Sequence, residues 1–360
     1  MGVLWLNLAT VFSLSLSARY FSNTRIEIGD LATPVKPNKF FAFVAFLTLA
    51  LVSGLRSNIG DTYVYRNIFE TNTFTWEMIL EEGEIGFGLL QILIQRFTDD
   101  SQVLLFTVSL LTLSLIVIVL YQYSRLFELS LFVFIASGMY LVSMNGMRQY
   151  LSAAIIFAGT KYLIEGKFLK YSALVLIAST IHQSAIVLLP VYFIVRREAW
   201  NKNTLFIIFI GVIGVGAYNQ LSEIFFNVIS DTDYGAYSDF NEGGANVIRV
   251  AVSAAPLVLA YFGRERLREI FPKSDYIVNM SMLCILFMLL STQSWIFARF
   301  AIYFDLFNLI LISWVVKVFQ PKDQTFVYYV IVTLYLMYFI YEYIITLNIQ
   351  YKSNYINLFN

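Results

Sequence analysis

The sequence predicts an all-α, polytopic membrane protein, and three observations support this prediction. Hydrophobic residues make up 59% of the chain and charged residues only 13%, and the mean hydropathy is +0.70. Soluble globular proteins do not have this profile. The apolar residues form about a dozen continuous runs, each long enough to cross or half cross a bilayer. Continuous rather than alternating runs favour helices and exclude a transmembrane barrel.

The apolar runs define one integral membrane domain over residues 1–360, with about twelve transmembrane or half-spanning helices. The first run has no basic residue before it, whereas a cleaved signal peptide normally has one, so we expect a retained span. The candidate spans are 2–19, 39–55, 102–122, 129–145, 147–164, 168–181, 183–196, 203–219, 247–262, 275–292, 296–317 and 325–347.

Two of these segments, 168–181 and 183–196, are too short to cross a core of ~30 Å alone at ~1.5 Å per residue. They flank His182, and we expect a broken or re-entrant pair bent at this histidine. A further amphipathic stretch, 86–97, is also short and carries Arg96. We expect it to lie in the interface, or to dip into the membrane and return.

Lysine and arginine set the predicted orientation. Most of the 24 basic residues lie in alternate loops, which we assign to the cytoplasm. An even number of spans then places both termini outside. If 168–196 were a single span, Arg196, Arg197 and the run 264–268 would lie outside, which conflicts with this bias and favours the hairpin. The formal net charge is zero, so a general attraction to nucleic acid is not expected.

Two long loops lie on the predicted outer side, at about 56–84 and 220–246. Long ordered loops are often lids or substrate-binding elements. Tyrosines in the second loop can stack on sugar rings or anchor the chain at the interface. Its acidic pair forms a pattern that can hold a divalent cation in sugar transfer, although such patterns are common in acidic loops. The residues concerned are Tyr234, Tyr237, Phe240, Asp231 and Asp233.

Ionisable groups at membrane depth are costly and mark function by default. In this chain, four arginines lie at the outer ends of four spans, and the only histidine lies at a helix break on the same side. Arginine forks bind phosphate or carboxylate groups, and histidine is the usual proton-transfer group near neutral pH. We therefore predict an anion-binding site with a proton-transfer group, formed by Arg56, Arg148, Gln149, Arg249, Arg299 and His182.

Each of these residues also has a structural alternative. Arg56 can pair with Asp61 in a cap, Arg148 can snorkel to the interface, and His182 can be a satisfied core residue. Asp305 and Glu342 fall inside predicted spans and are candidate partners for the arginines. Arg249 and Arg299 can each be either an interfacial anchor or an anion ligand.

No cofactor or metal ion is expected. The chain has no P-loop and no dinucleotide fingerprint, and a single histidine excludes a multi-histidine metal site. Its one cysteine, Cys284, cannot form an intrachain disulfide and is expected to be a buried small hydrophobe. The pair Asp99 and Asp100 is expected to cap the start of a helix.

Four stretches together resemble the EpsG family of bacterial exopolysaccharide-synthesis proteins, which are Wzy-like polymerases. No single motif decides the match, but the order and spacing of the stretches are fairly specific, and the resemblance spans nearly the whole chain. The stretches are 54–69 with Arg56 and Asp61, the turn Arg148-Gln149, the segment from Lys170-Tyr171 to Ile181-His182-Gln183-Ser184-Ala185, and Arg299 followed by Tyr303-Phe304.

The resemblance implies a GT-C-like helical membrane fold in the bacterial cytoplasmic membrane. It also implies the joining of repeat units carried on undecaprenyl pyrophosphate, with a growing glycan as donor and a new lipid-linked unit as acceptor. Other polysaccharide-synthesis membrane proteins are candidate partners. In such a reaction, outer arginines with Tyr303 would bind the pyrophosphate. His182 would be the first choice as base and Asp61 the second, with inversion at the anomeric carbon.

Three rival interpretations remain open. A transporter or flippase for lipid-linked sugars would also use broken helices and buried charge, but would have polar residues along its whole path. Another membrane transferase, such as a glycan ligase or a single-sugar transferase with a polyprenyl-phosphate donor, would share the arginine chemistry. A non-catalytic scaffold would tolerate replacement of His182 or Arg148.

Overall fold

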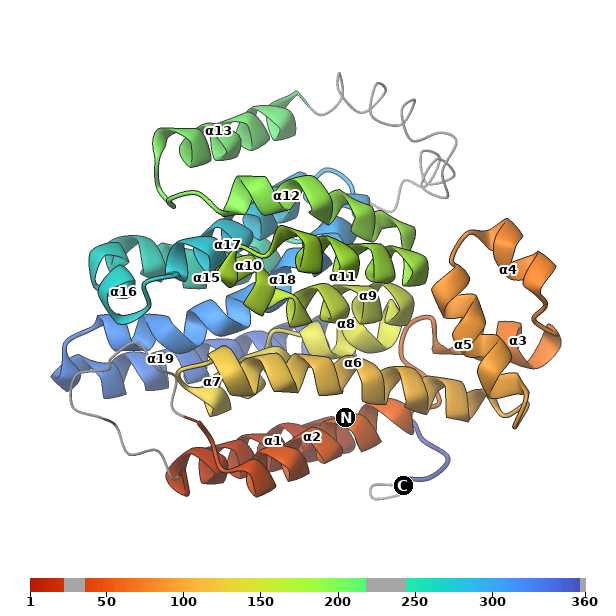
Figure 1. Ribbon diagram of the computed structural model, residues 1–360. Helices are drawn as coiled ribbons and strands as arrows, with labels where there is room; N and C mark the ends of the chain where they lie inside the picture. Colours follow the sequence, from red (N-terminus) through yellow and green to blue (C-terminus); the bar gives the residue numbers. More distant parts are fainter. Residues whose placement is uncertain (23–35, 218–243, 357–360) are drawn as a thin grey trace.

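The computed structural model describes residues 1–22, 36–217 and 244–356, and every regular element in these ranges is a helix. Most helices lie side by side in an elongated bundle (Figure 1). Up to residue 165 they are α1 (Gly2–Tyr20), α2 (Lys39–Gly54), α3 (Thr62–Thr71), α4 (Trp76–Glu82), α5 (Ile85–Gln95), α6 (Ser101–Tyr123), α7 (Phe127–Ala136), α8 (Met139–Asn145), α9 (Met147–Ala158) and α10 (Thr160–Glu165).

The remaining helices include two less regular pieces. A 3₁₀-helix, η1 (Gln183–Val187), precedes α12, and a π-helix, Ile340–Thr346, continues α19. The α-helices are α11 (Phe168–Ile181), α12 (Leu188–Val195), α13 (Lys202–Gly216), α15 (Val247–Phe262), α16 (Arg264–Ile270), α17 (Ser274–Leu290), α18 (Ile296–Val315) and α19 (Pro321–Phe339).

Three helical stretches of the described chain are long and apolar enough to cross a membrane: Ser101–Tyr123, Ile296–Val318 and Pro321–Thr346. The number rises to five if two bent pairs, α7 with α8 and α15 with α16, each count as one span. Every predicted apolar segment is helical, so the protein is a helical membrane protein. Helix length and composition do not confirm the predicted number of twelve spans, nor do they test the GT-C relationship.

Several predicted spans are interrupted for local reasons. The segment 129–145 bends by 56° between α7 and α8, where Gly138 has a left-handed φ of +89°. A side chain cannot be accommodated there, because the hydroxyl of Tyr343 lies where a Cβ would be, and this hydroxyl donates to the Ser137 carbonyl at 3.0 Å. The segment 147–164 divides at Gly159 into α9 and α10.

The predicted hairpin at 168–196 is confirmed. The ring of Phe168, at the start of α11, lies 5.1 Å from that of Tyr192 in α12. Beyond α12, the guanidinium of Arg196 lies against Gly166, so the chain returns to the end of the bundle from which α11 started. The bend between the two helices contains His182, as predicted.

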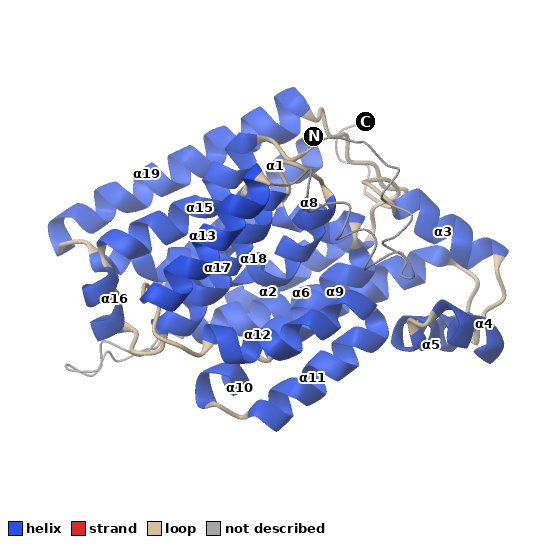
Figure 2. Ribbon diagram, turned by 90° about the horizontal axis from the view of Figure 1, so that it is seen from above, coloured by secondary structure: helices blue, strands red, loops and turns tan. Residues whose placement is uncertain are grey.

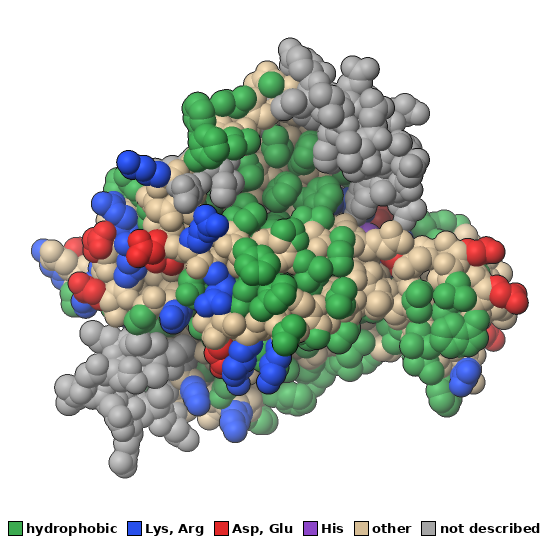
Figure 3. All heavy atoms as spheres, turned by 45° about the horizontal axis from the view of Figure 1, so that its top comes forward, with side chains coloured by type: hydrophobic (Ala, Val, Ile, Leu, Met, Phe, Trp, Pro, Cys, Tyr) green, Lys and Arg blue, Asp and Glu red, His purple; other side chains and the backbone are tan. Residues whose placement is uncertain are grey.

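The two ends of the bundle differ in charge. On the face drawn in Figure 3, most lysines and arginines gather toward the left end, opposite the helices α3–α5. At that basic end Arg19 pairs with the buried Glu128. Arg268 also pairs with Asp275 there, at 3.0 Å. This segregation agrees with the alternation of charge along the sequence.

The segment 56–84, predicted as a long loop between spans, contains helices of its own. It folds into α3 and α4, and these protrude with α5 at one end of the bundle (Figure 2). Phe69, Phe74 and Ile79 of this segment pack against Phe87 of α5 and form a small apolar core. The amphipathic stretch 86–97 forms most of α5, and its position at the membrane interface stays a prediction. The tyrosines and acidic pair predicted in the loop 220–246 fall within 218–243, outside the described residues.

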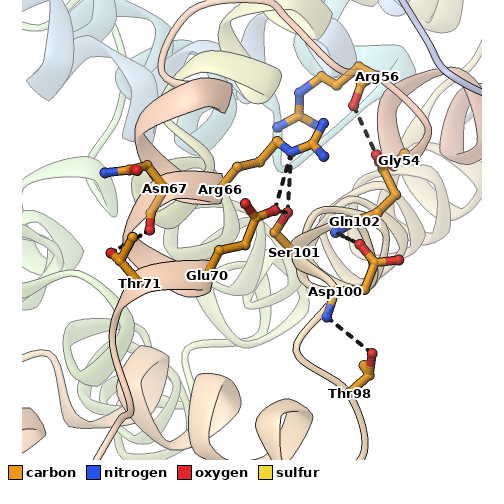
Figure 4. Close-up of polar contacts among 10 residues, drawn as sticks. All are labelled: Gly54, Arg56, Arg66, Asn67, Glu70, Thr71, Thr98, Asp100, Ser101 and Gln102. Carbon is orange, nitrogen blue, oxygen red and sulfur yellow. Dashed lines mark hydrogen bonds and ion pairs between the residues drawn. The ribbon is translucent and has the colours of Figure 1, made fainter.

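Helix α3 is anchored to the start of α6 by polar contacts (Figure 4). Arg66 donates to the Ser101 hydroxyl at 3.2 Å, and that hydroxyl also bonds to Glu70. Asp100 caps α6 by accepting from the backbone N–H of Gln102 at 2.9 Å, which confirms the predicted cap. These contacts attach α3 to the bundle.

A C-terminal strap, residues 350–353, closes over the turn that follows α2. The turn is strained, because Ile59 has a φ of 91°, an unusual value for a β-branched residue. Lys352 holds the turn on both sides: its carbonyl accepts from Ser57 at 2.8 Å, and its N–H donates to Asn58 at 2.7 Å. From the opposite side, the amide oxygen of Asn145 accepts from the Asp61 N–H at 2.8 Å.

Candidate active site

His182 lies at a break in the helical hairpin. α11 ends there because the backbone is extended, with φ −151° and ψ 116°. Two contacts from other helices fix the break. Ser152 of α9 donates to the carbonyl of Ala178 at 2.9 Å, and Tyr303 of α18 is hydrogen-bonded to Ser184 at 2.8 Å. The imidazole is therefore held at the end of the bundle opposite the basic one.

A carboxylate that the sequence pattern did not reveal, Glu84, faces this histidine. α4 ends at Gly83, which has a left-handed φ of +76°, and the turn carries Glu84 inward at the start of α5. The side chain is only 6% exposed. Its Oε1 lies 2.5 Å from Nδ1 of His182, and its Oε2 accepts from Nη1 of Arg148 at 2.6 Å. One carboxylate thus joins the two residues predicted as base and anion ligand.

Arg148 begins α9 and is held by aromatic rings as well as by Glu84. Its guanidinium carbon lies 5.9 Å from the ring centroid of Tyr65 and 5.8 Å from that of Phe87. Both distances are within the range of cation–π contacts. The side chain is 40% exposed, so its charge is partly screened by solvent. Its position next to His182 is as the sequence predicted.

Opposing effects act on the Glu84 carboxyl group, which lies in the turn between α4 and α5. Burial by itself raises its pKa, because the charged form loses solvation. The hydrogen bond with His182 and the positive charge of Arg148 outweigh burial and bring the pKa below the ordinary value of 4.5. Glu84 is therefore an ionised carboxylate at neutral pH.

The contact with Glu84 fixes the chemistry of the imidazole. An ionised carboxylate accepts but does not donate, so Nδ1 of His182 carries the proton of this hydrogen bond. In the neutral ring the lone pair then resides on Nε2. A carboxylate behind a histidine also stabilises the imidazolium that forms when Nε2 takes a proton. The pair Glu84–His182 thus has the arrangement of a general base and its orienting carboxylate.

Gln149 follows Arg148 in α9 and contacts the segment that carries Arg299. The buried amide of Gln149 donates to the carbonyl of Arg299 at 2.9 Å, which joins the start of α9 to the first turn of α18. The guanidinium of Arg299 lies over the ring of Trp295, 5.0 Å from its centroid. Tyr303, one turn further along α18, contacts Ser184. The start of α18 is therefore held against both the start of α9 and the segment that follows His182.

Arg249 belongs to a second ionic pair. At the start of α15 it donates from Nε to Oε1 of Glu342 at 2.6 Å. Glu342 is 1% exposed and lies in the π-helix, an element that often marks functional sites. The predicted pairing of Glu342 with an arginine is confirmed. Asp305, in contrast, accepts from the amide of Asn308 at 3.1 Å and has no arginine partner among the described residues.

Arg56 lies beneath the site and is fully buried. All five of its N–H groups point at protein atoms. The closest acceptors are the carbonyls of Ser53 at 2.6 Å and Met144 at 2.8 Å and the hydroxyl of Thr62 at 3.0 Å. Burial lowers its pKa to about 10, so it stays charged at neutral pH. This placement supports a structural role and gives no support to the predicted phosphate clamp.

Asp61 is not the partner of Arg56. It begins α3 at the strained turn, and its carboxylate makes no hydrogen bond or ion pair with a described residue. It is partly exposed at the same end of the bundle as His182. Within the described ranges, no three His, Cys, Asp or Glu side chains converge as a bound metal ion would require.

Glu84 was not predicted because its neighbours gave no pattern. It follows Glu81, Glu82 and Gly83 in a stretch that looks like an acidic surface turn. Its partners Arg148 and His182 are 64 and 98 positions away. The available signal was an acid next to glycine before an apolar stretch, at the predicted outer side.

Comparison with known proteins identifies the family. The model of the EpsG family, which is linked to exopolysaccharide synthesis, matches residues 39–356. The match covers α2 to the C-terminal strap and includes all the site residues described above. No curated protein and no solved structure is significantly similar to the chain. The match covers most of the sequence, and the chain therefore belongs to the EpsG family.

Proposed function

We propose that this protein polymerises oligosaccharide repeat units carried on undecaprenyl pyrophosphate into exopolysaccharide. The reaction would take place at the outer face of the bacterial cytoplasmic membrane, with both termini on that side, in a GT-C-like fold. The observation that carries the proposal is the chain of contacts Arg148–Glu84–His182, in which a buried carboxylate orients a histidine. Membership of the EpsG family supports a role in exopolysaccharide synthesis, and the contacts of Glu84 support a reaction that uses a general base.

In the proposed reaction, a hydroxyl of the acceptor sugar attacks the anomeric carbon of the donor glycan. The new glycosidic bond forms as the bond to the pyrophosphate oxygen breaks, and the pyrophosphate leaves with the electron pair. Nε2 of His182 takes the hydroxyl proton, and Glu84 stabilises the resulting imidazolium. Direct displacement of this kind inverts the anomeric configuration. Asp61, at the same end of the bundle, is the alternative base.

The leaving group carries most of the negative charge in the transition state. Preorganised positive groups aimed at such charge are usually the largest single contribution to catalysis. Arginines at the helix ends, Arg299 among them, would supply this charge, and guanidinium groups can do so without a metal ion. The polyprenyl tails would lie along the apolar surfaces of the bundle.

The test measures polymer and its precursor in cells that carry His182→Ala, Arg148→Ala or Arg96→Ala. Arg96 is the matched control, since it is an exposed arginine with no ionic partner among the described residues. Each variant is first checked for normal abundance in the membrane. We expect His182→Ala and Arg148→Ala to lose long polymer and to accumulate single repeat units exposed outside. Arg96→Ala should produce normal polymer.

Other outcomes would select a rival function. Accumulation of repeat units facing the cytoplasm would show that the protein moves lipid-linked sugars across the membrane. Unchanged polymer in both site variants would make the Arg148–Glu84–His182 chain structural, as in a scaffold. Loss of a different glycan, with normal polymer, would identify a ligase or a single-sugar transferase.

A further inference from the structure

The arginines predicted as one anion-binding group differ in whether their guanidinium groups are already paired with a carboxylate. Arg148 forms an ion pair with Glu84, and Arg249 forms one with Glu342. Arg56 is fully buried and its donors are used by backbone and side-chain groups of the fold. A phosphate that approached Arg148 would meet the Glu84 carboxylate within 2.6 Å of the same guanidinium. Like charges repel strongly in such a poorly solvated place.

Arg299 is different. Its guanidinium forms no hydrogen bond or ion pair with any described residue, and its side chain is partly buried. The Trp295 ring, 5.0 Å away, supports the flat face of the cation. A guanidinium held by its face keeps its N–H edge for a planar, bidentate contact with an oxyanion.

Two independent contacts hold the first turns of α18, which carry Arg299, against α9 and against the segment that follows His182. Gln149, the neighbour of Arg148, donates to the Arg299 carbonyl at 2.9 Å. One turn further along α18, Tyr303 is hydrogen-bonded to Ser184 at 2.8 Å. Ser184 follows the His182 break by two residues. An anion on Arg299 would therefore bind at the start of α18, the helix that contacts the segment after His182, without displacing Glu84.

We propose that Arg299 is the anchor for the pyrophosphate of a polyprenyl pyrophosphate, and that Arg148 is a positioning residue that holds Glu84. This inference rests on the proposed function, because it names the group that the site would bind. It divides the predicted arginine cluster into a binding part and a positioning part. Binding and turnover should therefore respond differently to the two substitutions.

The experiment uses the full chain in lipid nanodiscs and titrates it with farnesyl pyrophosphate by calorimetry. We expect Arg299→Ala to raise Kd at least about tenfold, or ~1.4 kcal/mol, and Arg299→Lys to lie between it and the parent. Arg148→Ala should change Kd less than about threefold and yet lose polymer in cells. Arg96→Ala controls for the loss of one positive charge, and farnesol controls for binding of the tail alone.

Thermal unfolding of each variant in nanodiscs would establish that it is folded. The inference is overturned if Arg148→Ala weakens binding as much as Arg299→Ala, or if Arg299→Ala leaves Kd unchanged. Equal weakening by Arg96→Ala would also overturn it, since the effect would then be general electrostatics. The proposed function fails on a separate result, which is normal polymer in His182→Ala cells, whatever the value of Kd.

Discussion

Replacing Glu84 by glutamine is the sharpest test of the site. The substitution keeps the size of the side chain but removes the negative charge that lies between His182 and Arg148. Glutamine can turn its NH₂ toward Nδ1 of His182, which moves the ring proton to Nε2 and abolishes the base. The carboxylate that stabilises the imidazolium is lost at the same time.

The size of the effect can be estimated from these contacts. A well-placed general base contributes roughly 10²–10⁴ in rate, or ~3–5 kcal/mol of the barrier, so we expect Glu84→Gln to lose activity within this range. The loss of stability should be smaller. Breaking a hydrogen bond to a charged group costs ~1–3 kcal/mol, and Arg148 is 40% exposed, so solvent can take over part of its charge.

The assay follows the ratio of long polymer to lipid-linked single units at equal membrane abundance. Glu81→Gln is the matched control, because Glu81 is an exposed acid three residues away with no ionic partner among the described residues. We expect Glu84→Gln to accumulate single units and Glu81→Gln to match the parent. Normal polymer in Glu84→Gln would refute the assignment of Glu84 and His182 as a catalytic pair.

Three further predictions concern stability. Arg56→Lys should lower the unfolding temperature of the purified protein nearly as much as Arg56→Ala, because the three donors of an ammonium group cannot replace the five donors of a buried guanidinium. An unfolding temperature in Arg56→Lys equal to that of the parent would contradict this. Arg249→Ala should cost ~1–3 kcal/mol, because Glu342 is then buried without its cation, although Arg249 is 39% exposed and its charge is partly screened. Adding Glu342→Gln should restore much of the loss in a double-mutant cycle, and no recovery would show that the pair is not coupled. Because the folded pKa of Glu84 lies below 4.5, its stabilising effect is present above that pH and lost as the pH falls further, so thermal stability should drop more steeply on acidification in the parent than in Glu84→Gln.

Local patterns in the sequence predicted the helices and some of the site well. The length limit on 168–181 and 183–196 predicted the hairpin, and the position of His182 between them predicted its break. Asp100 was predicted as a cap from its place before an apolar run. Such features depend on neighbours in the chain, so the sequence alone displays them.

Features that depend on distant partners were harder to predict. Arg56 and Arg148 both follow the end of an apolar helix, yet one is enclosed by backbone carbonyls and the other meets Glu84. Glu84 itself looks like a surface acid until the fold brings α5 against α11. The helices in 56–84 were missed because their apolar side is short and mixed with charge. In each case tertiary packing decides the role of the residue.

The C-terminal strap has a consequence for the order in which the molecule is completed. Ser353 donates to the carbonyl of Leu55, a residue made 298 positions earlier, so the turn after α2 receives this hydrogen bond only after all the intervening residues have been made. The strained backbone of Ile59 costs ~1–3 kcal/mol and needs those bonds to persist. Until residues 352 and 353 have been made, the turn lacks the hydrogen bonds that hold its strained backbone in place. The turn that begins α3 is thus completed later than the synthesis of helices α2 to α19, although it lies next to the first of them in the sequence.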